Sequence, residues 1–476
     1  MTRSKVDPKA DPIDELADLL SPFEQRGMDL SLERMQTALN DLANPCADVP
    51  AVQVVGTNGK GSIACMIHSG LTAAGLRSGL TTSPHLTSWC ERICVNQKQI
   101  ELAQLRQRLK QLQPVARDHN LTPFEQLISA ALVHFEANAL DWLVLEAGLG
   151  GRLDATTAHP YRPLIAIGSI GMDHCEHLGH SLTAISGEKA AVIGPGAHVI
   201  SAPQHEAVTK VLEARSQEMG ATLEWVEPLP DEWELGLPGH LQRRNGAVAR
   251  AALRRMNALG NSITEEQIQR GLAQARWPGR LQTLHWNHQF VRVDGAHNPD
   301  AAEQLALERR CWNQSGQQQI WILGIQGHKQ APEMLQMLLE PNDEAWIVPV
   351  PGHVSWTAKR LSEICPTHAH QLRSASCVED VLMHLFMNDA DSPKPTPVIA
   401  GSLYLIGSLL AEGVLKEHKG PSALNLMNRK AINTQADQTK QNQTNKAEGP
   451  EATYLDKNKE KECLADHVRP REPNAP

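Results

Sequence analysis

The stretch Val54-Val55-Gly56-Thr57-Asn58-Gly59-Lys60-Gly61-Ser62 decides how the chain begins to fold. The stretch begins at the end of the apolar run 51–55, which predicts a buried β-strand. It ends where a helical pattern over about residues 62–74 begins. Glycines let backbone N–H groups approach an anion closely, the N-terminus of the next helix faces the same place, and Lys60 adds a positive charge. The stretch therefore predicts a cradle for a nucleotide triphosphate at a strand-to-helix turn.

The loop departs from the usual phosphate-loop pattern, in which a glycine opens the loop and a serine or threonine follows the lysine. Val54 replaces that first glycine, and Gly61 replaces the hydroxyl residue. Because this hydroxyl normally binds magnesium, we expect the metal to find a hydroxyl elsewhere. A role in packing alone is the alternative for the glycines, but it leaves Lys60 unexplained.

The composition indicates an enzyme of two domains. With 476 residues, the chain is longer than one hydrophobic core usually holds. Its net charge of -9 argues against general binding of nucleic acid or of an anionic membrane. Nine scattered cysteines without a C-x-x-C pair predict neither a disulfide framework nor a zinc ribbon. No apolar stretch reaches the length of a membrane span, and residues 1–12 lack an apolar leader, so we expect a cytoplasmic protein.

Strand-like runs alternate with helix-length segments in two series, which is typical of α/β folds. The runs of the first series are Gln53–Val55, Trp142–Glu146, Leu164–Ser169 and His198–Ile200. Those of the second series are Phe290–Val293, Ile320–Gly324, Ala345–Val350 and Pro397–Ala400. We predict an ATPase-type parallel-sheet domain with a phosphate loop over residues 1–282, a smaller Rossmann-like α/β domain over residues 283–419, and a disordered polar tail over residues 420–476.

Two motifs place oxygen ligands at the ends of predicted strands, where open α/β sheets bind their ligands. Ser83, followed by Pro84, is placed to supply the missing hydroxyl, and a turn without any ligand is the alternative. Glu146 ends a fully apolar strand. Because an unpaired buried carboxylate is costly, we favour Glu146 as a metal ligand over the alternative of a structural salt bridge.

The segment Gly171–His180 contains the densest group of histidine, cysteine and acidic residues in the chain. A zinc site is one interpretation, but Cys175 is the segment's only cysteine, whereas the oxygen ligands predicted nearby suit magnesium better. A neutral His174 completes such a set, and we expect His177 and His180 at the surface or outside the metal's own ligands. Lys189 follows on a helical pattern, and its default interpretation is an exposed lysine.

Together with Asp294-Gly295-Ala296-His297-Asn298-Pro299, these motifs resemble the folylpolyglutamate synthase/dihydrofolate synthase family, which belongs to the Mur-ligase superfamily of ATP-dependent amide ligases. The resemblance extends over about residues 19–412. It implies that Thr57, Asn58, Gly59, Lys60, Gly61 and Ser62 hold the triphosphate of ATP. Two Mg²⁺ ions are implied at Ser83, Glu146, His174 and Lys189, with the lysine carbamylated. The implied catalytic residues are Lys60, Glu146, His174 and Lys189, and further nucleotide contacts are implied for Asn245, Arg280, Asp294 and His297.

The resemblance also implies the substrates. Thr122, Phe124 and Asp154 match segments that line a dihydropteroate pocket, where an aromatic ring stacks on the flat pterin. The implied enzyme is a monomer that joins L-glutamate to dihydropteroate, and to folates such as tetrahydrofolate, through an acyl phosphate. Three alternatives stay open: polyglutamylation alone, a Mur-type ligase for another acid, and a nucleotide-binding regulator without ligase activity. One departure from the family is Gln330, which follows Lys329 where the family usually has aspartate.

Overall fold

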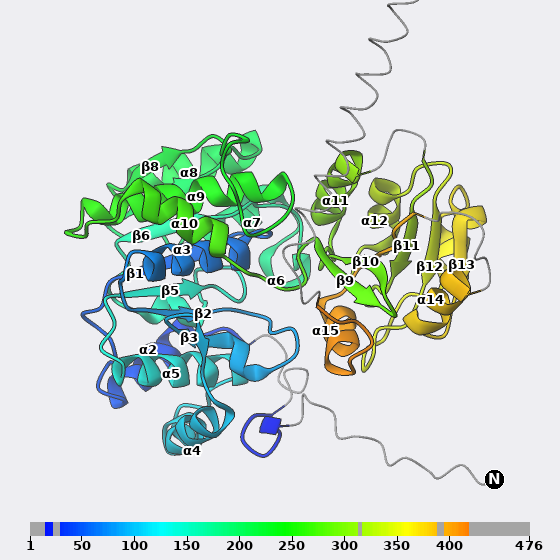
Figure 1. Ribbon diagram of the computed structural model, residues 1–476. Helices are drawn as coiled ribbons and strands as arrows, with labels where there is room; N and C mark the ends of the chain where they lie inside the picture. Colours follow the sequence, from blue (N-terminus) through cyan, green and yellow to red (C-terminus); the bar gives the residue numbers. More distant parts are fainter. Residues whose placement is uncertain (1–14, 22–28, 313–316, 388–394, 418–476) are drawn as a thin grey trace, which may run out of the picture. The chain divides into compact units, whose positions relative to one another are not determined.

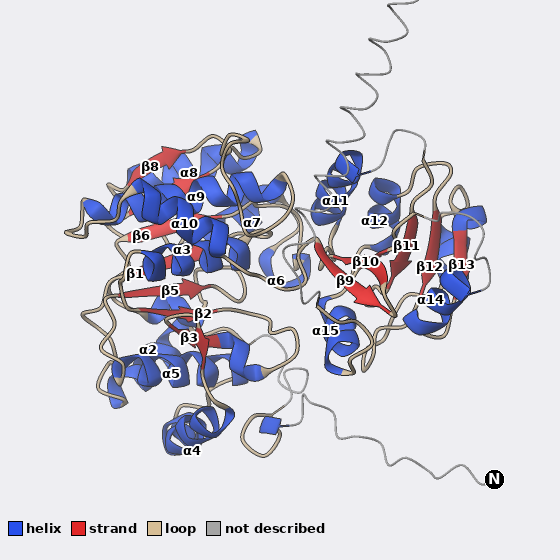
Figure 2. Ribbon diagram, viewed as in Figure 1, coloured by secondary structure: helices blue, strands red, loops and turns tan. Residues whose placement is uncertain are grey.

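The structure is a computed structural model that describes residues 15–21, 29–312, 317–387 and 395–417. These residues contain two β-sheets, each covered by helices (Figures 1 and 2). The predicted tail 420–476 and the polar segment 1–12 lie outside the described residues. Among the described helices, none combines the length and the apolar character needed to cross a membrane.

The first sheet has eight strands in the order β4-β3-β2-β5-β1-β6-β7-β8. Its strands are β1 (Ala51–Val55), β2 (Ser78–Thr81), β3 (Ile93–Val95), β4 (Lys98–Gln99), β5 (Trp142–Glu146), β6 (Leu164–Ile167), β7 (His198–Ser201) and β8 (Thr222–Trp225). All neighbours pair in parallel except β2 with β3 and β3 with β4, which are antiparallel. β1 therefore lies between two parallel partners, β5 and β6, with all five of its residues buried.

Helices cover both faces of this sheet. They are α2 (Leu32–Asp41), α3 (Lys60–Ala73), η2 (Trp89–Arg92), α4 (Leu102–Asp118), α5 (Pro123–Glu136), η3 (Ala155–Ala158), α6 (Cys175–Leu178), α7 (Leu182–Ala190), α8 (Glu206–Glu218), α9 (Leu241–Asn257) and α10 (Glu265–Gln274). Successive side chains of a strand point to opposite faces. Val52 and Val54 accordingly pack with α3, α9 and α10, whereas Ala51 packs with α2, α4 and α5, and Val55 with α7 and α8.

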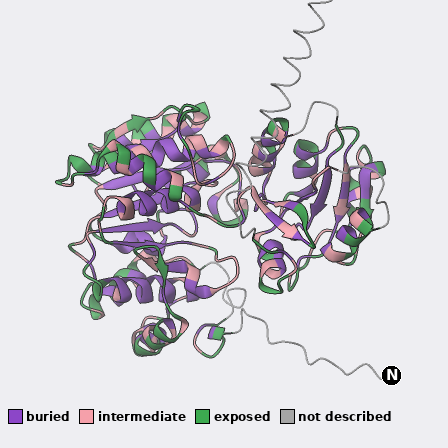
Figure 3. Ribbon diagram, in the orientation of Figure 1, coloured by how far each residue is buried: buried purple, intermediate pink, exposed green. Residues whose placement is uncertain are grey.

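The second sheet has six strands in the order β13-β12-β11-β14-β10-β9, parallel except for the β9–β10 pair. Its strands are β9 (Gln282–Trp286), β10 (Gln289–Val293), β11 (Ile320–Leu323), β12 (Glu344–Ile347), β13 (Leu372–Ser374) and β14 (Val398–Ala400). The helices are α11 (Pro299–Trp312), α12 (Ala331–Leu338), α13 (Ala358–Ile364), η4 (Ala369–Gln371), α14 (Val378–Met387) and α15 (Leu403–Ala411). In Figure 3 the central strands of both sheets are buried, while exposed positions lie mainly on helices and loops.

The predicted α/β fold with two mostly parallel sheets is confirmed. Every strand predicted in both series is present, with ends that differ by a few residues: β6 stops at Ile167, and β12 covers Glu344–Ile347. The proposed domain boundary at residue 282 falls on the first residue of β9, the edge strand of the second sheet. Both sheets place the carboxyl ends of several parallel strands at one edge, and ligand-binding loops are expected at that edge.

Candidate active site

The phosphate loop connects β1 to α3. Gly59 caps the helix in the left-handed conformation with φ of 84°, which a residue with a side chain rarely adopts. The first N–H groups of a helix have no partner within it, so α3 offers donors at this end. The ammonium group of Lys60 donates to the carbonyl oxygens of Gly56 and Thr57, at 3.2 Å each. The loop thus brings the N-terminus of α3 and one cation together, whereas the N–H groups of Thr57 and Asn58 donate to the carbonyl oxygen of Ser169. That this loop holds a triphosphate stays a prediction.

Gly61 is required by packing. A Cβ atom at this position would lie 2.7 Å from the indole ring of Trp277, closer than such contacts occur. Gly59 is similarly close to Asn245, whose Oδ1 would lie 2.5 Å from a Cβ there. The missing hydroxyl after Lys60 therefore has a structural reason, because the Trp277 side chain occupies the space that a serine or threonine would need.

Glu146, at the end of β5, is buried with 3% of its surface exposed. Its Oε2 accepts a hydrogen bond of 3.0 Å from the backbone N–H of Ser83. Burial raises the pKa of Glu146 to about 7, although the positive charge of Lys60 acts in the opposite direction. A carboxylate in this state is stabilised by an added cation, so Glu146 and the neighbouring Ser83 fit a divalent metal that prefers oxygen ligands.

Lys189 lies on α7 with only 4% of its surface exposed, so its default interpretation as an exposed lysine is wrong. Its ammonium group donates to the carbonyl oxygen of Gly56 at 2.8 Å. Burial, together with the charge of Lys60, lowers the pKa of Lys189 to about 7. A lysine that loses its proton near neutral pH has the nucleophilic amine that carbamylation by carbon dioxide requires. The predicted carbamate therefore fits this residue, and it stays a prediction.

His174 opens the short helix α6 in the left-handed conformation, with φ of 50°. Burial lowers the pKa of His174 to about 4, so the imidazole is neutral at physiological pH and able to bind a metal. His177 and His180 are exposed, as predicted. Asp173, His174, Glu176 and His177 lie in a row with neighbouring side chains 3.8 to 3.9 Å apart, but among the described residues no three such side chains are arranged to hold a metal ion.

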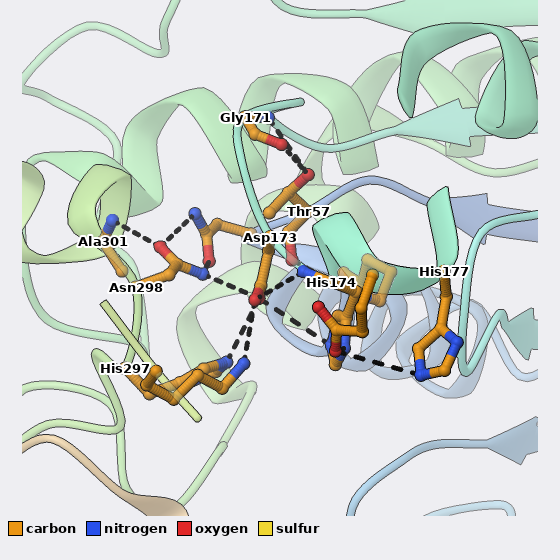
Figure 4. Close-up of polar contacts among 12 residues, drawn as sticks. Thr57, Gly171, Asp173, His174, His177, His297, Asn298 and Ala301 are labelled. Atoms are coloured by element: carbon orange, nitrogen blue, oxygen red, sulfur yellow. Dashed lines mark hydrogen bonds and ion pairs between the residues drawn. The ribbon is translucent and has the colours of Figure 1, made fainter. Parts of the chain in front are cut away.

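Asp173 is a residue of this site that the sequence analysis did not single out (Figure 4). Its carboxylate accepts hydrogen bonds from Lys329 at 2.8 Å and from Asn298 at 3.0 Å, and His297 Nε2 lies 3.6 Å away. Burial alone would raise the pKa of Asp173, but the nearby His297 and the charge of Lys329 hold that pKa well below its usual range. Asp173 therefore joins the loop after β6 to three residues associated with the second sheet.

A pair of asparagines adds to this connection. Asn58 of the phosphate loop and Asn298 exchange hydrogen bonds of 3.1 and 3.3 Å between their side-chain amides. The Oδ1 of Asn298 also accepts from the N–H of Ala301, at the start of α11. The side-chain amide of Asn298 therefore contacts both the phosphate loop and Asp173 (Figure 4).

The segments predicted to bind the acid substrate lie beside Glu146. Thr122 caps α5 in a capping box with Glu125, and Phe124 packs over Gly148, where a Cβ atom would lie 2.7 Å from the ring. The buried carboxylate of Asp154 accepts four hydrogen bonds, from the N–H groups of residues 148, 149 and 156 and from the hydroxyl of residue 156. Asp154 thus fixes the loop that follows β5, a role that sequence reasoning did not foresee.

Most of the predicted residues line one cavity of about 1010 Å³. They are Thr57, Asn58, Gly59, Lys60, Gly61, Ser83, Thr122, Phe124, Glu146, Asp154, His174, Lys189, Arg280 and His297. Three predicted residues do not line it, namely Ser62, Asn245 and Asp294. Ser62 is buried in α3, Asn245 contacts the phosphate loop, and Asp294 accepts hydrogen bonds from the N–H groups of Leu281 and Ala296.

The cavity also contains residues that the sequence analysis missed. Arg92 is buried, donates to His85 Nδ1 at 2.8 Å and lies over the ring of Trp89. Burial lowers the pKa of His85 to about 3, so this histidine is neutral and accepts the hydrogen bond. Both residues follow the Ser83-Pro84 pair in the sequence. The signal that could have indicated Arg92 is a charged residue on a short segment close to a predicted ligand.

Comparison with known proteins identifies the relatives of this chain. Residues 280–412 match the family described as dihydrofolate synthetase, C-terminal domain. The chain is 30% identical over 420 residues to dihydrofolate synthetase of Saccharomyces cerevisiae, covering 80% of this chain and 97% of that protein. It is 31% identical over 409 residues to folylpolyglutamate synthase of Lacticaseibacillus casei, covering 79% and 92%.

The fold is also similar to that of a solved structure, Mycobacterium tuberculosis folylpolyglutamate synthase complexed with ADP and AMPPCP. The TM-score is 0.76 at 26% sequence identity, and the match covers 87% of this chain and 100% of that chain. The likeness therefore includes both sheets described above.

Proposed function

Because the chain belongs to the dihydrofolate synthase/folylpolyglutamate synthase family of ATP-dependent ligases, we propose that it joins L-glutamate both to dihydropteroate and to folates such as tetrahydrofolate. Its relatives include one named for the first activity and one named for the second, at nearly equal identity. The ligase chemistry is common to both activities, and the proposal concerns its substrates, its metal and its residues.

One observation carries the proposal. A single cavity is lined by the phosphate loop, by Glu146 and by Phe124. An acid that stacks its ring on Phe124 would therefore reach the same space as the triphosphate held by the loop. Holding two reactants in one cavity replaces a bimolecular encounter by a local step, and this contribution to rate is large.

The reaction has two steps in this proposal. The carboxylate of the acid attacks the γ-phosphorus of ATP, the bond from that phosphorus to the bridging oxygen breaks, and ADP and an acyl phosphate form. The neutral amine of glutamate then attacks the acyl carbon and forms the C–N bond. Phosphate leaves with the electron pair of the broken C–O bond and takes up the proton that the nitrogen loses. Lys60 and the N–H groups of the loop stabilise the charge that develops on the transferred phosphoryl group.

The site residues divide between holding the nucleotide and holding a metal. Ser83, Glu146 and His174 would hold Mg²⁺, with Lys189 as a further ligand once carbamylated. Bound there, the metal supplies positive charge that neutralises the phosphoryl oxygens. Asn245, Arg280, Asp294 and His297 would hold the rest of the nucleotide. We also propose that the enzyme acts as a monomer in the cytoplasm and binds neither nucleic acid nor membrane.

A single activity is the second candidate function. It is favoured by the names of the two relatives, each of which has only one of the two activities in its name. A folylpolyglutamate synthase alone would accept tetrahydrofolate and reject dihydropteroate. In that case Phe124 would pack against Gly148 and would not bind dihydropteroate.

The deciding experiment measures ADP release by the purified protein with ATP, Mg²⁺ and L-glutamate. Dihydropteroate and tetrahydrofolate are compared as the acid, and the products are identified by mass. We expect turnover with both acids. Turnover with tetrahydrofolate alone would replace the proposal by the single activity, and turnover with neither acid would refute both.

A further inference from the structure

Gln53 is a polar residue in the middle of the buried strand β1. The other four residues of β1 are apolar, and none of the surface of Gln53 is exposed. The strand lies between β5 and β6, and the phosphate loop starts directly after it. A buried amide is costly unless its oxygen and its nitrogen both form hydrogen bonds. The partners of this amide therefore decide what a glutamine does at this place.

Arg162 determines which way the amide of Gln53 points. Its Nη1 donates to Oε1 of Gln53 and, at 3.0 Å, to the carbonyl oxygen of Val192. Its Nε donates to the carbonyl oxygen of His159 at 2.9 Å. Burial lowers the pKa of Arg162 to about 10, so the guanidinium keeps its charge at neutral pH. Because a guanidinium only donates, the atom of Gln53 that faces it is the oxygen, and the amide nitrogen faces the other way.

The amide nitrogen of Gln53 donates to two threonine hydroxyls. Its Nε2 lies 2.9 Å from Oγ1 of Thr156 and 2.8 Å from Oγ1 of Thr157. Since each hydroxyl accepts from Nε2, its own proton is directed away from Gln53. The hydroxyl of Thr156 donates to Oδ1 of Asp154, and that of Thr157 donates to the carbonyl oxygen of Gly151 at 2.7 Å. The hydrogen bonds of this chain therefore all run from the arginine toward the loop that follows β5.

Asp154 connects the chain of hydrogen bonds to the active-site cavity. Its Oδ2 accepts from the N–H groups of Gly148 and Leu149, at 2.8 and 3.0 Å, and all three residues line the cavity. Gly148 is the residue over which Phe124 packs. Burial raises the pKa of Asp154, whereas the hydrogen bond from Thr156 acts in the opposite direction. The chain thus supports both the charge of Asp154 and the position of the loop beside Phe124.

We propose that Gln53 and Arg162 are positioning residues for the acid substrate, which hold the Asp154 carboxylate and the loop 148–151 in place. Neither of the two residues lines the active-site cavity, so they act through the threonines. The proposal rests on the proposed function, in which the acid lies against Phe124 and Asp154. A glutamine suits position 53 because one end of its amide accepts from a cation and the other end donates two hydrogen bonds.

The first test reverses the chain at one atom. In Gln53→Glu the side chain keeps its shape, and Arg162 keeps the new carboxylate ionised. Because this carboxylate cannot donate, the hydroxyl of Thr156 turns its proton toward position 53 and Asp154 loses a hydrogen bond.

Binding of dihydropteroate is measured by calorimetry with ADP and Mg²⁺ present, and KM and kcat are measured by ADP release. Tetrahydrofolate replaces dihydropteroate if the unaltered protein turns over that acid alone. We expect Gln53→Glu to raise the Kd and the KM for the acid about tenfold, as loss of a hydrogen bond to a charged group predicts. The kcat and the KM for ATP should change less than about twofold, because the chain contacts neither the phosphate loop nor the metal ligands.

A second variant tests the chain from its other end. Arg162 lines a second cavity of about 1050 Å³, together with residues of α7 and α8. In Arg162→Ala a guanidinium ion from solution can therefore reach the place of the missing side chain. We expect this variant to raise the KM for the acid as Gln53→Glu does, and millimolar guanidinium to restore most of the loss. Urea at the same concentration is the control, since it has a similar shape without the charge, and it should restore nothing.

Gln319→Glu is the matched control for charge placed on a buried glutamine. Gln319 is fully buried beside β11, and its Nε2 donates to the carbonyl oxygens of Ile320 and Thr396 at 2.9 Å each. It does not line the active-site cavity. This variant should lower the temperature of thermal unfolding while the KM for the acid stays the same.

The results separate a positioning role from a purely structural one. A lower unfolding temperature with an unchanged Kd for the acid would overturn the proposal, and so would an equal rise of KM for the acid and for ATP. If Gln53→Glu does not fold, Arg162→Ala decides, and equal effects of guanidinium and urea would refute the proposal. If the unaltered protein neither binds nor ligates dihydropteroate or tetrahydrofolate, the proposed function itself fails.

Discussion

The two sides of the cavity differ in how they hold their charges. On the side of the first sheet, Lys60, Glu146 and Lys189 are ionisable groups whose pKa values are shifted by burial. On the side of the second sheet, Arg360 is exposed and His353 is half-buried. Strongly shifted pKa values are frequent where chemistry occurs, since burial makes each charge depend on its neighbours. We therefore expect the reaction on the side of the first sheet, where buried charges that depend on one another lie together.

Substitution of the phosphate-loop lysine is the strongest way to break this comparison. In Lys60→Met the loop keeps its backbone but loses the cation that bonds to Gly56 and Thr57. We expect turnover to fall about 1000-fold, because this charge stabilises the transferred phosphoryl group. ADP release measures the effect, and thermal unfolding checks the fold. Lys210→Met, at an exposed lysine outside the cavity, serves as control. A loss below about tenfold would place the reaction elsewhere.

The pH dependence of stability sharpens the contrast for Glu146. Its folded-state pKa of about 7 lies above the ordinary value of 4.5, so the folded protein binds more protons than the unfolded chain between these pH values. Stability therefore falls as pH rises through this window, and Glu146→Gln should abolish the fall. We expect the variant to match the unaltered protein near pH 4.5 and to exceed it by about 3 kcal/mol at pH 8.

This difference is measured by urea unfolding at both pH values, with a chelator present and nucleotide absent. Glu206→Gln is the control, because Glu206 is exposed and paired with Lys210. If Glu146→Gln shifts stability equally at the two pH values, burial does not control the charge of Glu146. The side of the cavity formed by the first sheet would then lack the burial-controlled charge that distinguishes it from the side formed by the second sheet.

Lys189 tests whether a buried lysine here acts as a metal ligand. We expect Lys189→Ala to lower turnover about 100-fold, a typical loss when a group that organises a metal site is removed. Short carboxylates such as acetate should restore part of the activity, since they replace the carboxylate end of a carbamate. Near-normal activity, or a loss that carboxylates do not repair, would argue against the carbamate. With ¹³C-labelled bicarbonate, the unaltered protein should show a carbamate NMR signal that is absent from the variant.

The sequence was sufficient for the fold because its strongest signals are local. Apolar runs ending in glycine or in a charged residue predicted β1, β5, β11 and β14. Among the strands that were not predicted, β4 and β8 are short or exposed at the edges of a sheet, so they bury little apolar surface and no period-2 pattern marks them. β2 is buried between two strands, but its residues Ser78–Thr81 include only one large apolar side chain, so no apolar run marks it.

The site was predictable where residue type and position agree, as for Lys60 at the phosphate loop and Glu146 at a strand end. It was not predictable where the role depends on burial by distant segments. Lys189 has no local signal, because its environment comes from the phosphate loop more than a hundred residues earlier. Asp173 was missed for the same reason, since Lys329 and Asn298 are distant in sequence.

The contact between Asp173 and Lys329 is where the two sides of the cavity meet, and it gives the smallest expected effect. Asp173→Asn keeps the shape of the side chain but loses the charge that Lys329 bonds at 2.8 Å. Both side chains are nearly buried, so the coupling exceeds that of an exposed pair.

We expect about a tenfold loss of kcat/KM in Asp173→Asn and in Lys329→Gln. If the pair acts as one unit, the double variant loses no more than either single variant, and the cycle gives a coupling of about 1.4 kcal/mol. Losses that multiply to about 100-fold would mean that the two residues act separately and that this contact does not join the two sides during the reaction.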